Sequence, residues 1–72
     1  KLSYREQREW EGMEEAILAA EERLERSRRA AEDPAVASDA AALTERYGAL
    51  AEAQAEVDRL YARWAELEAL RG

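Results

Sequence analysis

The chain has 72 residues, of which 17 are acidic and 11 basic, and its formal net charge is −6. It contains no His and no Cys, which excludes a His- or Cys-based catalytic site, a zinc finger and a disulfide scaffold. Ala supplies half of the apolar residues, which make up 47% of the chain, so the remaining larger side chains suffice to line a helix–helix seam but not to fill a globular core.

The first predicted helix covers about residues 4–31. Ser3 and Glu6 have the spacing of a capping box at its start. Apolar or small residues then recur at alternating spacings of three and four, at Trp10, Met13, Ile17, Ala20, Leu24, Ser27 and Ala31. This heptad pattern predicts a single seam along the helix. Gly12 lies beside that seam, where its missing side chain is expected to admit a neighbouring bulky ring.

A hinge is predicted over about residues 32–38. Pro34 cannot donate to a continuing helix, and it disfavours the α conformation at Asp33. Asp33 is a candidate cap for a short turn that has Pro34 at its first position. The chain is therefore expected to reverse direction here.

The second predicted helix covers about residues 39–70, with Ser38 or Asp39 as its N-cap. Tyr47 and Tyr61 flank its seam. The seam positions are Leu43, Arg46, Leu50, Ala53, Val57, Leu60, Trp64 and Leu67. Two long amphipathic helices joined by a short hinge predict an all-α fold, a two-helix antiparallel coiled-coil hairpin.

We expect residues 1–72 to form one domain, with Trp10 near Leu60, Trp64 and Leu67. One seam gives little stability at this size. The hairpin is therefore expected either to dimerise into a four-helix bundle or to be supported by a larger protein. Because the chain begins at Lys1 rather than Met, we expect it to be part of such a larger protein.

The sequence lacks the usual signs of a catalytic or metal site. It has no Gly-rich phosphate loop, no Ser/His/Asp set and no calcium-binding loop. Its longest purely apolar run, Ala16 to Ala20, is far too short to span a membrane. We therefore expect these residues to hold no catalytic site, no metal and no cofactor, and to have no membrane partner.

Most charges of opposite sign are interspersed along the helices, as on a solvated coiled-coil surface. The segment 23–29 differs, because it holds one Glu and four arginines, namely Arg23, Arg26, Arg28 and Arg29. A basic stripe of this kind is expected for phosphate contact. Arginines near the C-terminal end of a helix also stabilise its dipole, and the acidic balance of the chain favours this second interpretation. A smaller basic group occurs at the other end of the helix, at Lys1, Arg5 and Arg8.

The two ends of the chain resemble a known family. Residues 1–9, KLSYREQRE, and residues 60–70, LYARWAELEAL, resemble the opening and closing motifs of the C-terminal domain of ABC-F ATP-binding cassette proteins of the Uup type. Between these motifs the family has a two-helix coiled-coil hairpin with a Pro-containing hinge. The resemblance therefore covers the whole chain, and its specificity lies in the paired end motifs.

The resemblance implies a cytoplasmic parent protein with two tandem ATPase cassettes, which use ATP and magnesium, and no membrane domain. It implies that the parent acts on or near the ribosome. The hairpin would then be a nucleic-acid-binding or docking arm for DNA or ribosomal RNA. Lys1, Arg5 and Arg8 lie in the matching opening motif, whereas the four arginines of 23–29 depend on the charge argument alone.

Two other interpretations remain open from the residues themselves. In the first, the hairpin is a protein-interaction or oligomerisation coiled coil. In the second, it folds against the parent ATPase cassettes and regulates them. The end motifs also have a structural interpretation, in which Tyr4, Trp64 and Leu67 clasp the two ends of the chain.

Overall fold

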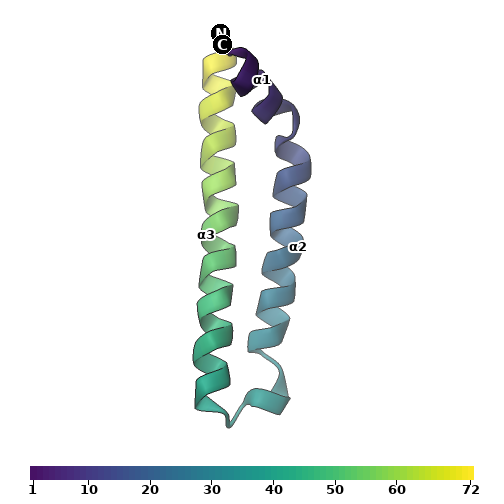
Figure 1. The fold of residues 1–72 in the computed structure, drawn as a ribbon, viewed down its shortest axis with the longest axis vertical. Helices are drawn as coiled ribbons and strands as arrows, with labels where there is room; N and C mark the ends of the chain where they lie inside the picture. The colour runs from purple at the N-terminus through teal and green to yellow at the C-terminus, as the bar shows by residue number, and fades with distance from the viewer.

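The computed structural model describes all 72 residues and contains only helices and the turns between them (Figure 1). The elements are α1 (Tyr4–Glu11), α2 (Met13–Ala31), the short 3-10 helix η1 (Pro34–Val36) and α3 (Ala40–Arg71). The long helices α2 and α3 lie side by side and antiparallel, with both chain ends at one end of a rod of 52 × 15 × 15 Å. The predicted all-α hairpin is confirmed.

Three of the predicted caps form. The Ser3 hydroxyl accepts the Glu6 N–H at 3.2 Å, and the Glu6 carboxylate accepts the Ser3 N–H at 2.9 Å, which completes the capping box. Asp33 caps η1 and Asp39 caps α3, each by accepting a backbone N–H from the turn that follows it. These local hydrogen bonds fix where α1, η1 and α3 begin.

The first helical segment differs from the prediction, because it is divided at Gly12 into α1 and α2 rather than continuous over 4–31. Gly12 has φ −92° and ψ 1°, and α1 leans toward the end of α3 instead of continuing the axis of α2 (Figure 1). The expectation that Gly12 admits a bulky ring is also wrong: a Cβ there would meet only backbone oxygens of Arg8 and Glu9, at 3.8 and 4.0 Å. Glycine has the weakest helix propensity apart from proline, so a bend concentrates there.

The core is the predicted seam. Every predicted seam position of both helices is buried or half-buried, and Leu67 is fully enclosed. One cluster holds most of the buried side chains: Met13, Ile17, Ala20, Val57, Leu60 and Leu67, with Leu2, Trp10, Leu24 and Trp64 packed against it. Toward the hinge only Ala31 and Val36 are buried. Hydrophobic stabilisation therefore concentrates in the half of the rod that carries the chain ends.

Candidate nucleic-acid interface

The predicted basic residues form two separate groups. Lys1, Arg5 and Arg8 lie at the open end of the hairpin, and we call them the end group. Arg23, Arg26, Arg28 and Arg29 lie in the half of α2 nearer the hinge, and we call them the middle group. From Arg5 to Arg23 the chain advances 18 residues, or about 27 Å at helical rise. The two groups therefore do not share one surface patch.

The middle group is spread around α2. At about 100° per residue, Arg28 projects about 140° away from Arg23. Arg23 approaches Glu52 of α3 at 3.9 Å, whereas Arg28 pairs with Glu32 on its own side of the rod at 2.6 Å. The expected single basic stripe is absent, because successive arginines of this segment face different directions.

Carboxylates of α2 neutralise half of the middle group. Glu25 accepts hydrogen bonds from both Arg28 and Arg29. These two guanidinium groups, Arg28 first, lower the pKa of Glu25, and Glu25 in turn raises the pKa of Arg28. Within the middle group only Arg26 makes no ion pair.

The end group, by contrast, is free of ion pairs. The nearby carboxylates have other partners, since Glu6 accepts from Ser3 and Glu9 from Arg63. No carboxylate pairs with the end group, whose members are Lys1, Arg5 and Arg8. Three of the four cations without an ion pair in this chain are therefore at the open end.

An exposed aromatic ring accompanies the end group. The Tyr4 side chain is 75% exposed, so the prediction that it clasps the chain ends is wrong. Its hydroxyl accepts a hydrogen bond from Arg8 at 3.1 Å, and the Arg8 guanidinium lies 5.9 Å from its ring centroid. The backbone nitrogen of Lys1 donates to the Leu70 carbonyl at 2.8 Å, which is one of the contacts between the two ends. Free cations beside an exposed ring suit phosphate contact combined with base stacking.

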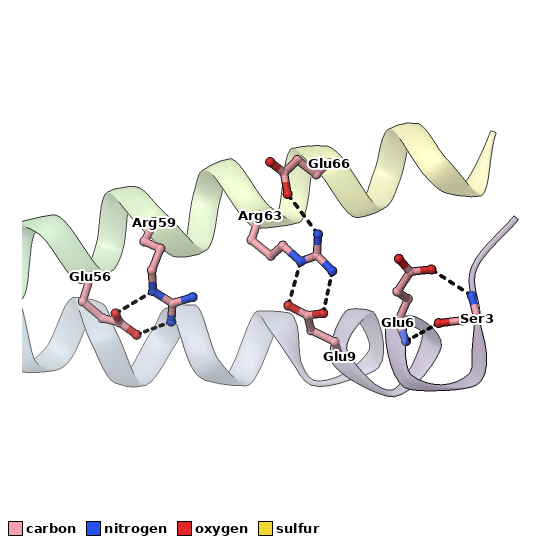
Figure 2. Close-up of polar contacts among 7 residues, drawn as sticks. All are labelled: Ser3, Glu6, Glu9, Glu56, Arg59, Arg63 and Glu66. Atoms are coloured by element: carbon pink, nitrogen blue, oxygen red, sulfur yellow. Dashed lines mark hydrogen bonds and ion pairs between the residues drawn. The ribbon is translucent and has the colours of Figure 1, made fainter.

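Two arginines of α3 that were not among the predicted residues, Arg59 and Arg63, are held by carboxylates, and Arg63 reaches Glu9 of α1 (Figure 2). Arg63 donates to both carboxylate oxygens of Glu9 and to Glu66, and Arg59 donates to both oxygens of Glu56. The hydrogen bonds to Glu9, and after them the one to Glu66, raise the pKa of Arg63.

Both arginines are thus already neutralised, which distinguishes them from the end group. One signal in the sequence was available: Glu9 and Arg63 both occupy the position before a seam residue, and such positions meet across an antiparallel hairpin.

The fold and its residues define a class of protein domain, a coiled-coil hairpin without catalytic motifs. No group of acidic side chains is arranged to hold a metal ion, and the sequence has no Gly-rich phosphate loop. None of the helices has the length and apolarity that crossing a membrane would require.

The family model described as the ABC transporter C-terminal domain matches residues 1–69. The chain belongs to this family, the coiled-coil C-terminal domain found in ABC-F proteins like Uup. Membership associates the hairpin with a parent ABC ATPase. No curated protein and no solved structure matches the chain.

Proposed function

We propose that this hairpin is a non-catalytic arm of a cytoplasmic ABC-F ATPase and that it contacts nucleic acid, DNA or ribosomal RNA, through its end group. ATP and magnesium would be used by cassettes of the parent outside these residues. The observation that carries the proposal is the set of three cations without ion pairs, one of which, Arg8, donates to the hydroxyl of the exposed Tyr4. Family membership supports the association with the ATPase.

The charge distribution favours the open end over the rest of the rod. The chain carries a net charge of −6, so most of its surface repels phosphates. A phosphate at the end group meets three cations, Lys1, Arg5 and Arg8, none of which is held in an ion pair. Because these cations are not hydrogen-bonded to carboxylates, contact with phosphate breaks no existing ion pair and its gain is not offset.

The test is a titration with labelled duplex DNA, single-stranded DNA and structured RNA at about 50 and 200 mM salt, where phosphate contacts show as a loss of affinity. The duplex should have about 20 base pairs, because at about 3.4 Å per pair it is then longer than the 52 Å rod. Three phosphate contacts predict a slope of about −2.7 for log affinity against log salt on duplex DNA.

Two double variants are compared, R5E/R8E in the end group and R26E/R29E in the middle group. We expect the first pair to abolish binding and the second to weaken it only slightly. Neither Arg5 nor Arg8 makes a hydrogen bond or an ion pair with α3, so circular dichroism should show an intact fold. Absence of binding at low salt, or loss of binding in the R26E/R29E protein alone, would overturn the assignment to the end group.

Homodimerisation and regulation of the parent ATPase stay predictions from the sequence. Homodimerisation predicts a mass and helicity that rise with concentration in sedimentation and circular dichroism. Regulation predicts that removing the hairpin changes the ATPase rate of the parent without nucleic acid present.

A further inference from the structure

The two long flanks of the seam differ in character. One flank carries the Arg63–Glu9 and Arg59–Glu56 pairs (Figure 2). On the other flank the Tyr61 hydroxyl donates to Glu21 at 2.8 Å, which links α3 to α2. We call this second side the aromatic flank; it is built around Glu14, Glu21 and Arg28 of α2 and Tyr47, Gln54 and Tyr61 of α3. Each of these residues comes directly after the second core residue of its heptad. Positions of this kind lie on the same side of an antiparallel hairpin, so the six residues line one face.

The aromatic flank has a hollow of about 570 Å³ near the hinge. Its hydrophobic lining consists of Leu24, Tyr47, Leu50 and Ala51. Tyr47 remains 52% exposed and Leu24 and Leu50 are only half-buried, because the seam here has small partners such as Ser27 and Ala53. The hairpin therefore leaves apolar surface uncovered at this point.

A second hollow, of about 270 Å³, lies toward the chain ends between Trp10 and Trp64. From Leu50 in the first hollow to Trp64 in the second, α3 advances 14 residues, or about 21 Å. Tyr47 and Tyr61 repeat the same interval. This distance equals about four turns of helix, so one partner helix with two bulky apolar anchors four turns apart would reach both hollows.

The charge of this flank specifies the partner further. Two arginines lie on it: Arg28, which Glu25 and Glu32 already hold, and Arg71, whose guanidinium lies 4.0 Å from the ring centroid of Trp10 and pairs with Glu68. Six carboxylates lie along this flank, either in the lining of the two hollows or hydrogen-bonded to Trp10 or Tyr61. They are Glu11, Glu14, Glu21, Glu25, Glu32 and Glu68. The flank is thus acidic around apolar hollows.

We propose that the aromatic flank is the docking surface for a basic amphipathic helix of a protein partner. Such a helix would place apolar anchors in the two hollows and Lys or Arg side chains against the carboxylates, completing a three-helix arrangement. A second copy of this chain fits less well, because a symmetric pairing would bring the same six carboxylates together. Nucleic acid is repelled by the same charges, so this surface is distinct from the end group.

The probe is a Trp-free synthetic helix of about 20 residues, six turns long, with Leu anchors 14 residues apart and Lys at its flanking positions. A second peptide has Glu in place of every Lys. Binding is followed by the fluorescence of Trp10 and Trp64 and by calorimetry. We expect micromolar affinity for the Lys peptide that weakens with salt, and at least about a hundredfold weaker binding of the Glu peptide.

Matched variants locate the contact. E14K on the aromatic flank is compared with E45K on α3, since both positions are exposed and neither residue makes an ion pair. Y47A is compared with Y4A, whose ring lies at the open end. We expect E14K and Y47A each to weaken binding about tenfold and the two controls to change it less than about twofold.

Several outcomes would overturn the proposal. One is the absence of Lys-peptide binding up to about 1 mM. Others are equal binding of both peptides, or an equal loss in E45K and E14K. Self-association of the hairpin that Y47A abolishes would assign the flank to a second copy. Loss of duplex DNA binding in Y47A but not in Y4A would assign it to nucleic acid.

Discussion

Arg63 of α3 binds both carboxylate oxygens of Glu9 in α1, with Nε–Oε2 2.9 Å and Nη2–Oε1 3.0 Å, although 54 residues separate them (Figure 2). The same guanidinium donates to Glu66 at 2.9 Å. Because α1 contains no buried residue, its attachment to α3 depends on such polar contacts and on the half-buried ring of Trp10. The relationship between Glu9 and Arg63 therefore helps to set the position of the end group.

The first prediction concerns this pair. We expect E9Q and R63Q each to lower the melting temperature, and the double variant to lose less than the sum, because either single change already removes the contact between the two side chains. The decrease in melting temperature of each single variant should be smaller at about 1 M salt, where the Debye length is only about 3 Å. R59Q serves as the control, since Arg59 pairs only with Glu56 in its own helix. Additive losses in the double variant would contradict a coupling between Glu9 and Arg63.

The second prediction concerns pH. The hydrogen bonds from Arg63 lower the pKa of Glu9 below its ordinary value of 4.5. Stability from this pair is therefore fully present above 4.5 and is lost as the pH falls through the lower pKa of the folded state. The difference in melting temperature between the wild-type protein and E9Q should stay constant from pH 7 to about 5 and shrink below 4.5. A difference that grows on acidification would contradict the assigned direction.

The third prediction concerns the core. Leu67 is fully enclosed, so L67A should cost about 2–5 kcal/mol of unfolding free energy. A hairpin with one seam has little more than that to lose, and we expect most of its helical circular dichroism signal to disappear at room temperature. L70A is the matched control: Leu70 is 44% exposed, and its truncation should change the free energy by less than about 0.5 kcal/mol.

The fourth prediction concerns the break between α1 and α2. The backbone of Gly12 lies at φ −92°, which other residues adopt, and an added Cβ makes only ordinary contacts there. G12A should therefore raise the unfolding free energy by about 0.4–1 kcal/mol, because Ala leaves the unfolded chain less conformational freedom than Gly does.

The matched control is G48A in α3, where nothing lies within 4 Å of an added Cβ and the same gain is expected. The unfolding free energies of both variants are measured by urea denaturation. A gain in G48A with a loss in G12A would mean that docking of α1 requires glycine at the bend.

Several features of the candidate site were beyond prediction from the sequence. The segment 23–29 reads as one basic cluster, yet its arginines point in different directions and two of them bind Glu25. Tyr4 lies in an end motif, which suggested a clasp, but its ring is 75% exposed. Surface charges and rings are not tied to the hydrophobic period, so their partners follow from the distance between helices and the local bend rather than from spacing in the chain.

The sequence by itself determined the class of fold, the seam and the caps. Heptad spacing and capping residues act through contacts within a few positions of each other, and each helix carries that information alone. Only the tertiary structure decided that the helix divides at Gly12, that Glu9 meets Arg63, and that the aromatic flank keeps two hollows. These features depend on the register of α1 and α2 against α3, and an Ala-rich seam encodes register weakly because its small side chains interlock little.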